Sequence, residues 1–329
     1  MISIALLGAG RIGQIHGRNI AASPRARLAA IADPFPEGAK ALSAATGAPI
    51  RTAEEILADA SIDAVLIGTP TDTHADYIDA AAKAGKAVFC EKPVDMSSAR
   101  IRETLERVDK AGTALMIGFN RRFDPNFAAL QKRLADGAAG NVELVTILSR
   151  DPAPPPVSYI KHSGGLFRDM MIHDFDMARF LLGEDAVEVF AVGSALVDPA
   201  IGEAGDVDTA AVVLKTASGK ICQISNSRRA TYGYDQRIEV HGSKGMLSAA
   251  NVPETTVSFA GADGIVADPV QNFFLERYAA AYRREIEAFI DVVEKGTRPS
   301  PSGVDGLKAQ MMADAATQSR ETGKPVSIG

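Results

Sequence analysis

Three side chains in the sequence carry groups that move protons in enzymes. Lys92 has an amine, Asp169 a carboxylate and His173 an imidazole. A helix would place Asp169, His173 and the later Asp176 on one face, because they are spaced by four and then three residues. A carboxylate can hold an imidazole in one tautomer and support its positive form, which makes the imidazole a general base. The spacing predicts proton transfer, and the alternative is a structural Asp–His pair inside a helix.

Lys92 lies in the sequence Glu91-Lys92-Pro93, which directly follows a short apolar run at 86–90. Apolar runs of this length predict buried strands, so Lys92 is expected at the end of a strand. An amine that is partly withdrawn from water beside a positive charge gives up a proton more readily, which suits a proton shuttle. Taken alone, a lysine at a strand end is more often a surface residue.

A glycine-rich turn separates the apolar run at 2–7 from a helical pattern at 11–22. Gly8, Gly10 and Gly13 match the pattern G-x-G-x-x-G. The first glycine permits a tight turn, the second lets the backbone approach a pyrophosphate, and the third allows close packing of helix on strand. The N–H groups and the positive dipole at the start of the helix attract the same anion. The pattern therefore predicts a dinucleotide site.

Asp33 supports that prediction, because it follows a second apolar run at 27–32 and lies twenty residues beyond Gly13. A carboxylate at this place accepts hydrogen bonds from both ribose hydroxyls and would repel the 2′-phosphate of NADP. The sequence therefore favours NAD over NADP. Arg11 works against that preference, since a basic residue near the adenosine would offset part of the repulsion. The alternatives are a glycine-rich turn in a domain that binds a methyl donor or in one that binds nothing.

The first third of the chain alternates apolar runs with helical patterns. Apolar runs lie at 2–7, 27–32, 62–68, 86–90 and 114–119, and helical patterns lie at 11–22, 53–59, 72–84 and 97–111. Continuously apolar strands that alternate with helices indicate a parallel sheet covered on both faces. Residues 1–119 are therefore predicted to form a doubly wound parallel sheet, a Rossmann domain within an α/β protein. Ligands of such sheets bind beyond the carboxyl ends of the strands.

The remaining residues, 120–329, are predicted to form a second α/β domain. Apolar β-rich runs lie near 141–150, 186–197, 207–216, 219–227, 235–241 and 255–259. The turn at Ser218-Gly219 joins two of these runs, which indicates antiparallel neighbours. Helices are expected from the glycines at 164–165 to Gly183, at about 272–295 and at about 303–322. The last of these is expected to pack back on the first domain.

Composition excludes several classes of partner. The chain has 35 basic and 41 acidic side chains, for a net charge of -6, which gives no electrostatic reason to bind nucleic acid or anionic lipid. No apolar stretch approaches the ~20 residues of a membrane helix, and the first residues do not resemble a signal peptide. Cys90 and Cys222 form no CxxC pair, so the reducing cytoplasm is the expected compartment. The usual Cys/His ligand spacing is missing, and no metal site is predicted.

Several motifs together resemble the glucose–fructose oxidoreductase/inositol dehydrogenase (Gfo/Idh/MocA) family over nearly the whole chain. They are GAGRIG at 8–13, EKP at 91–93 and GG-x-F-x-D-x-x-x-H-D-x-D at 164–176. The stretches NSRRATYGYDQR at 226–237 and HGSKG at 241–245 resemble its inositol dehydrogenase branch. The resemblance implies an NAD-binding Rossmann domain and a C-terminal α/β domain with a large open, mostly antiparallel sheet. It also implies that subunits assemble through that sheet into a homotetramer.

The resemblance assigns roles to individual residues. It implies that Lys92, Asp169 and His173 are catalytic, and that Arg122 and Tyr234 join them in contacting the substrate. The cofactor is expected to lie against Gly8, Gly10, Arg11, Ile12, Gly13, Asp33, Thr69, Pro70, His74, Glu91 and Lys92. Arg11 departs from the pattern of some NAD-dependent members, which bears again on the choice between NAD and NADP.

The reaction implied by the resemblance is NAD-dependent oxidation of a secondary hydroxyl of a cyclic polyol, with myo-inositol converted to 2-keto-myo-inositol. His173 is expected to take the hydroxyl proton while hydride leaves the same carbon for the nicotinamide. One alternative is a dehydrogenase of another inositol isomer or of a pyranose sugar. A further alternative is a non-catalytic sensor of a dinucleotide and a sugar. Lys92, Asp169 and His173 argue against the sensor, because binding alone needs no matched acid and base.

Overall fold

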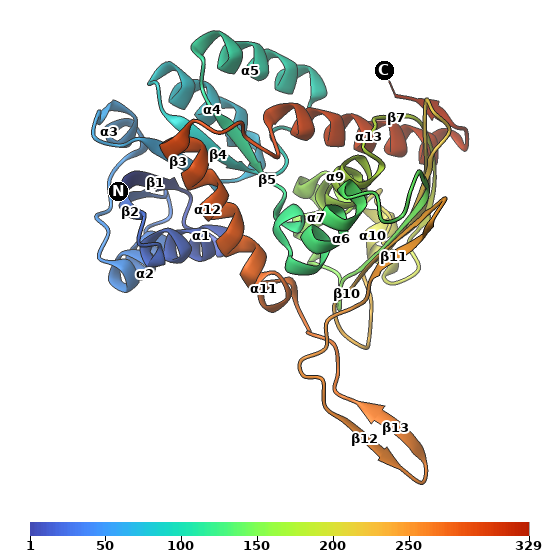
Figure 1. The fold of residues 1–329 in the computed structure, drawn as a ribbon. Helices are drawn as coiled ribbons and strands as arrows, with labels where there is room; N and C mark the ends of the chain where they lie inside the picture. The colour runs from blue at the N-terminus through green and yellow to red at the C-terminus, as the bar shows by residue number, and fades with distance from the viewer. Residues whose placement is uncertain (329) are drawn as a thin grey trace. The chain divides into compact units, whose positions relative to one another are not determined.

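The computed structural model describes residues 1–328 and divides by its contacts into two units. The first unit contains residues 1–123 and 281–310, and the second contains residues 124–280 and the described residues from 311 on. Each unit is built on a sheet of its own (Figure 1). Matching the prediction of an α/β protein, both units also contain helices.

The sheet of the first unit has five strands in the order β2-β1-β3-β4-β5. They are β1 (Ile2–Leu7), β2 (Ala26–Ala32), β3 (Ala64–Ile67), β4 (Ala87–Glu91) and β5 (Leu115–Gly118). All four neighbouring pairs are parallel. Every residue of the central strand β3 is buried, as the unbroken apolar run indicated. The predicted Rossmann sheet is confirmed.

Helices connect these strands in the first unit. They are α1 (Arg11–Ala22), α2 (Pro36–Thr46), α3 (Ala53–Ala58), the short 3₁₀ turn η1 (Thr71–Thr73) with α4 (His74–Lys83), and α5 (Ser98–Ala111). The ends of α5 follow the expected capping rules, because Ser97 accepts a hydrogen bond from the Arg100 N–H and Gly112 is left-handed. The sequence did not predict α2, although Pro36 begins it and the left-handed Gly47 ends it.

The helix expected at 272–295 is two helices, α11 (Phe274–Arg277) and α12 (Ala279–Lys295). On α12, Ile286, Phe289 and Ile290 are buried in one apolar cluster with Ile4 and Leu6 of β1. This burial explains why residues 281–310 belong to the first unit. The final helix α13 (Gly303–Thr322) matches its expected bounds, and its residues from 311 on belong to the second unit.

The second unit has a seven-stranded sheet in the order β11-β10-β6-β9-β8-β7-β14. Its strands are β6 (Val142–Arg150), β7 (Ala186–Ser194), β8 (Thr209–Thr216), β9 (Ile221–Ser227), β10 (Asp235–Gly242), β11 (Gly245–Ala249) and β14 (Val326–Ser327). Only β6 and β9 pair in parallel, and all other neighbours are antiparallel. The structure confirms the large, mostly antiparallel sheet. A separate hairpin, β12 (Ser258–Gly261) with β13 (Gly264–Ala267), extends from this unit (Figure 1).

Helices cover one side of this sheet (Figure 1). They are α6 (Pro125–Ala135), α7 (Val157–Ser163), α8 (Gly165–Asp169), α9 (Ile172–Leu182) and α10 (Pro199–Glu203). Along β8, buried and exposed residues alternate, so one face of the strand packs inward and the other does not. Among the described residues, no helix combines the length and the apolar character needed to cross a membrane.

The prediction of one uninterrupted helix from the glycines at 164–165 to Gly183 is wrong. The helix is broken at Met170 and Met171, between α8 and α9. The N–H groups of both methionines donate to the carbonyl of Leu166, at 3.0 and 2.9 Å. One carbonyl thus accepts two bonds and the helical register slips by a residue. Both methionine side chains are buried by this arrangement.

Candidate active site

The glycine loop after β1 has the shape that a dinucleotide requires. A Cβ on Gly8 would lie 2.5 Å from the carbonyl carbon of Gly68, and one on Gly13 would lie 2.0 Å from the oxygen of Gly8. A Cβ on Gly10 would meet no atom within 4 Å. Gly10 is also the N-cap of α1 and has no side chain to occupy the first N–H groups of that helix. The backbone around Gly10 therefore leaves room and donors for a pyrophosphate.

Asp33 is held beside this loop by two backbone amides. Its Oδ2 accepts from the N–H of Ala9 at 2.6 Å, and its Oδ1 accepts from the N–H of Phe35 at 2.7 Å. Each carboxylate oxygen has a second lone pair that can accept a ribose hydroxyl. The predicted Arg11 is exposed at the first position of α1, and its neighbour Ile12 is partly buried.

Gln14 also supports the loop, although the sequence did not single it out. Its amide nitrogen donates to the carbonyls of Ala9 at 3.0 Å and Gly38 at 2.8 Å. The bond to Gly38 joins the glycine loop to α2, the helix that the sequence did not predict.

His74 joins the loops that follow β3 and β4. Its Nδ1 lies 2.7 Å from the carbonyl oxygen of Pro93, and its Nε2 lies 2.8 Å from that of Thr69. The ring is buried, so these two bonds define its position. Pro70 belongs to the same turn, where its carbonyl accepts from the hydroxyl of Thr73 at 2.7 Å. The arrangement places the predicted residues of this loop next to the segment that carries Lys92.

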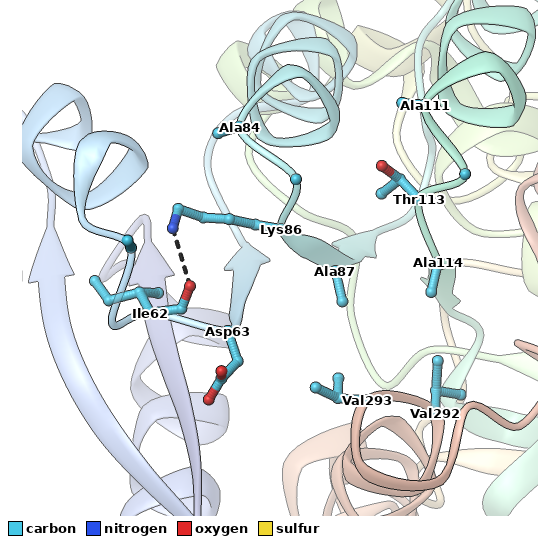
Figure 2. Close-up of a pocket in the computed structure, with 13 residues that line it drawn as sticks. Ile62, Asp63, Ala84, Lys86, Ala87, Ala111, Thr113, Ala114, Val292 and Val293 are labelled. Atoms are coloured by element: carbon cyan, nitrogen blue, oxygen red, sulfur yellow. Dashed lines mark hydrogen bonds between the residues drawn. The ribbon is translucent and has the colours of Figure 1, made fainter.

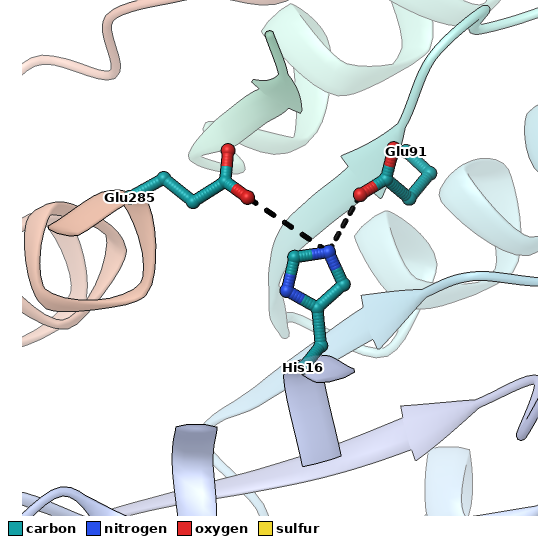
Figure 3. Close-up of side chains that lie close together, drawn as sticks. All are labelled: His16, Glu91 and Glu285. Carbon is teal, nitrogen blue, oxygen red and sulfur yellow. Dashed lines mark hydrogen bonds and ion pairs between the residues drawn. The ribbon is translucent and has the colours of Figure 1, made fainter. Parts of the chain in front are cut away.

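Glu91, at the end of β4, belongs to a buried cluster with His16 of α1 and Glu285 of α12 (Figure 3). His16 Nε2 lies 2.6 Å from Glu91 Oε1 and 3.9 Å from Glu285 Oε1. Burial, and after it the charge of Glu91, raise the pKa of Glu285 well above its usual value, which favours the protonated form of this carboxyl. The sequence offered one signal for Glu285, since its carboxyl interrupts the apolar stripe of α12.

Among the described residues, His16, Glu91 and Glu285 are the one group whose potential metal-ligand atoms lie close enough together to bind one ion. These atoms lie within 4.8 Å of one another. Two ligands of a tetrahedral zinc ion, each at about 2.0–2.2 Å from the metal, would lie roughly 3.3–3.5 Å apart. The distance of 2.6 Å between His16 and Glu91 is instead that of a hydrogen bond. His16 and Glu91 are therefore hydrogen-bonded to each other, and Glu285 Oε1 lies beyond hydrogen-bond distance of the same nitrogen.

Lys92 and Arg122 follow β4 and β5 in the first unit. Lys92 is partly buried directly after Glu91. Arg122 Nη2 lies 3.0 Å from Asp305 Oδ1, and the Arg122 side chain is 8% exposed. Asp305 is itself fixed, because its Oδ2 accepts from the N–H and the hydroxyl of Ser302 at 2.7 and 2.9 Å. The sequence did not predict Asp305, which is distant from Arg122 along the chain.

Asp169 and His173 lie on opposite sides of the helix break in the second unit. Asp169 is the last residue of α8, and His173 is in the first turn of α9. Asp169 Oδ1 accepts from the hydroxyl of Tyr159 at 3.0 Å, and Asp169 Oδ2 lies 3.7 Å from Nη2 of Arg228. The expectation that one continuous helix face carries Asp169 and His173 is therefore wrong, because the two residues belong to different helices.

Tyr234 and Asp176 are buried in the same unit. The Tyr234 ring meets that of Tyr278 edge-on, with centroids 5.9 Å apart. Its backbone N–H donates to the carbonyl of Gln271 at 3.0 Å. Asp174, on α9, accepts from the amide nitrogen of Asn226 at 3.0 Å. Burial and the charge of Asp174 raise the pKa of the nearby Cys222, so this thiol stays neutral and unreactive.

The predicted residues thus fall into two groups. The first unit brings the glycine loop, Asp33, the Thr69–His74 turn, Glu91, Lys92 and Arg122 to the carboxyl ends of its strands. The second unit carries Asp169, His173 and Tyr234.

A hollow of about 520 Å³ in the first unit is unrelated to these residues (Figure 2). Asp63, Lys86 and Thr113 line it, and each precedes a strand, so it lies at the amino ends of β3, β4 and β5. The Lys86 amine is occupied there by the carbonyls of Asp59 and Ile62, at 2.6 and 2.9 Å. Ligands of parallel sheets bind at the carboxyl ends of the strands, so this hollow is not the expected ligand site.

Comparisons with known proteins agree with the fold and with the glycine loop. Residues 2–119 match the model of an oxidoreductase family with an NAD-binding Rossmann fold, and residues 131–328 match the C-terminal alpha/beta domain of that family. The chain is 55% identical to an inositol 2-dehydrogenase of Rhizobium meliloti, over 99% of both chains. It is 46% identical to a myo-inositol 2-dehydrogenase of Thermotoga maritima, over 99% of this chain and 98% of the other.

Among solved structures, the chain resembles a scyllo-inositol dehydrogenase from Lactobacillus casei with bound NAD(H) and scyllo-inositol. The TM-score is 0.93 at 31% identity, with 100% of this chain and 99% of the other covered. Both family models and the full-length relatives confirm the resemblance that the sequence motifs indicated. The chain therefore belongs to the Gfo/Idh/MocA oxidoreductase family, with its NAD-binding Rossmann fold and its C-terminal α/β domain.

Proposed function

We propose that this protein oxidises a secondary hydroxyl of a cyclic polyol with NAD, and that the polyol is myo-inositol, which becomes 2-keto-myo-inositol. The observation that carries the substrate is the full-length identity of 55% and 46% to two relatives named for inositol oxidation. The glycine loop, Lys92 and the Asp169–His173 pair support a dehydrogenase, since they combine a dinucleotide cradle with an amine, a carboxylate and an imidazole.

The first unit would hold the cofactor. The amides at the start of α1 bind the pyrophosphate beside Gly10, and Asp33 accepts the ribose hydroxyls. Bound NAD supplies the acceptor for a hydride. The Asp33 carboxylate disfavours the 2′-phosphate of NADP, whereas the exposed Arg11 would attract it. NAD is the proposed cofactor because Asp33 is oriented by two backbone hydrogen bonds, while Arg11 is a solvated side chain.

Proton transfer falls to three side chains. His173 takes the proton of the hydroxyl that is oxidised, and Asp169 holds the His173 ring in the tautomer that accepts it. Lys92 hydrogen-bonds the reacting oxygen and helps to carry the proton from His173 to the solvent. Arg122 and Tyr234 hydrogen-bond other hydroxyls of the polyol, because a buried donor without a partner would weaken binding by about 1–3 kcal/mol.

The test is NADH formation by the purified protein with a panel of alcohols. We expect the highest kcat/KM with myo-inositol, and lower values with scyllo-inositol, other isomers and glucose. A higher value with another inositol isomer or a pyranose would replace myo-inositol as the substrate. NAD binding without reduction by any member of the panel would identify a sensor. The same assay with NADP tests the cofactor.

We also propose a cytoplasmic homotetramer. One face of the second unit's sheet is buried, and the opposite face carries exposed apolar side chains. These include Phe190, Val192, Val213, Ile221 and Met246. Apolar patches of this kind are typical of subunit interfaces. Light scattering measures the mass in solution, and a monomer at micromolar concentration would contradict the tetramer. The cytoplasm is consistent with two free, buried cysteines.

A further inference from the structure

A buried arginine, Arg228, follows β9 in the second unit. Its side chain is 1% exposed, and its Nε and Nη2 are buried without a hydrogen-bond partner. A guanidinium keeps its charge in proteins, and a buried charge without compensation is strongly unfavourable. Nearby carboxylates must therefore supply the negative charge.

Two carboxylates face Arg228 Nη2. Asp169 Oδ2 lies at 3.7 Å and Asp206 Oδ2 at 3.9 Å. Both distances exceed that of a hydrogen bond, so the attraction is Coulombic, and it is strengthened by the low dielectric of the interior. Arg228 is therefore placed between the proposed partner of His173 and a second acid.

These two carboxylates lie at the two ends of α8. Asp169 ends the helix, and the oxygens of Asp206 both accept from the N–H of Leu166 at its start, each at 3.1 Å. A Cβ on Gly165 would lie 2.6 Å from Asp206 Oδ1, so only glycine lets this carboxylate approach. One buried cation thus faces a carboxylate at each end of the short helix that carries Asp169.

Arg228 is itself well anchored. Its backbone N–H donates to the carbonyl of Asp208 at 2.8 Å. The Asp208 carboxylate is fully buried and accepts from the amides of Leu196, Val197 and Asp198 at 2.8, 2.9 and 3.0 Å. By contrast Tyr159, whose hydroxyl donates to Asp169, is 51% exposed. Arg228 is thus anchored more firmly than Tyr159 beside this carboxylate.

We infer that Arg228 is a positioning residue for the reaction: its fixed positive charge holds the Asp169 carboxylate in the orientation that serves His173. The inference rests on the proposed function, which gives Asp169 and His173 their roles. Arg228 acts on the rate of proton transfer through Asp169. A purely structural role would instead make Arg228 necessary only for the folding of the second unit.

The two roles are separated by pre-steady-state kinetics, in which the first turnover of NADH formation is followed with saturating NAD and myo-inositol. We expect Arg228→Met to lower the rate constant about 10²-fold, as a small misplacement of a catalytic group does. Arg228→Lys restores part of the rate, because it restores the charge without the planar fork. A structural role would lower the amplitude, which counts folded molecules, and leave the rate constant unchanged.

The control is Arg179→Met on α9. Arg179 is also largely buried, with a side chain 16% exposed, and it pairs with Asp185 at 2.7 Å near the far end of the helix from His173. This variant should lose stability and keep its rate constant. Should Arg228→Met fail to fold, Arg228→Gln gives the same measurement with a neutral polar side chain.

Two failures are distinguishable. If the wild-type protein reduces NAD with myo-inositol and the neutral Arg228 variants keep its rate constant, the positioning role is overturned and the proposed function stands. A wild-type protein that forms no NADH with myo-inositol overturns both.

Discussion

His16 Nε2 lies 2.6 Å from Glu91 Oε1, in a buried hydrogen bond between α1 and the end of β4. The helix that begins at the glycine loop is thereby joined to the strand that leads into Lys92. Glu285 of α12 completes the cluster, with its Oε1 at 3.9 Å from the same nitrogen. The bond connects the part of the first unit that would bind the pyrophosphate with the part that would face the nicotinamide.

Lys92→Ala should lower kcat by about 10²–10⁴-fold, because the variant loses the group proposed to pass on the proton. NAD affinity should stay nearly unchanged, since the glycine loop and Asp33 are intact. Steady-state kinetics and NAD titration measure the two quantities. Lys110→Ala, an exposed lysine in the last turn of α5, is the control. Turnover near that of wild type in Lys92→Ala would remove this residue from the mechanism.

Glu285→Gln should become more stable relative to wild type as the pH rises above the ordinary glutamate pKa of 4.5. The folded-state pKa of Glu285 is raised, so its contribution to stability is full below the unfolded-state pKa and is lost as pH rises through the folded-state pKa. Glutamine keeps the neutral shape without this loss. Thermal unfolding at a series of pH values measures the difference in stability, and a difference that stays constant would show that folding does not raise the pKa of Glu285.

His16→Ala should destabilise the protein by about 1–3 kcal/mol, because it leaves the buried Glu91 carboxylate without its partner. Denaturant unfolding measures this loss. Asn19→Ala, at a partly buried position of the same helix, controls for the change in helix packing. Equal stabilities of the two variants would mean that the bond to Glu91 contributes nothing.

Gly10→Ala and Gly13→Ala should fail in different ways. A methyl group on Gly13 would press into the Gly8 carbonyl, so this variant should lose about 1–3 kcal/mol of stability. A methyl group on Gly10 meets nothing in the protein, so this variant should fold normally yet bind NAD much more weakly. Unfolding and NAD titration report the two effects. Normal NAD affinity in Gly10→Ala would move the pyrophosphate away from this loop.

Replacing Asp33 with Ser should shift the cofactor preference toward NADP by about 10-fold or more in the ratio of kcat/KM values, roughly 1.4 kcal/mol. The repulsion of the 2′-phosphate would be gone while Arg11 remains. Arg11→Ala tests the opposite contribution and should lower activity with NADP in either background. An unchanged ratio in the Asp33 variant would show that other residues select the cofactor.

The sequence by itself determined the parallel sheet, the glycine loop and helix 11–22. These depend on local patterns, which are unbroken apolar runs, glycines at fixed spacing and the regular repeat of a helix. It also identified the family from motifs that are short in sequence. It did not predict the break at Met170–Met171, since a slip of one residue in hydrogen bonding leaves the apolar pattern of the segment unchanged.

The partners of the predicted residues were decided by the tertiary structure alone. Glu285 meets His16, and Asp305 meets Arg122, from segments far away in the chain, and α12 belongs to the first unit because its apolar face is buried against β1. Arg228 likewise faces Asp169 and Asp206, which are distant from it along the chain. Local patterns show which side chains are apolar or charged. Which charge compensates which depends on distances through space, and these follow only from how the strands and helices pack.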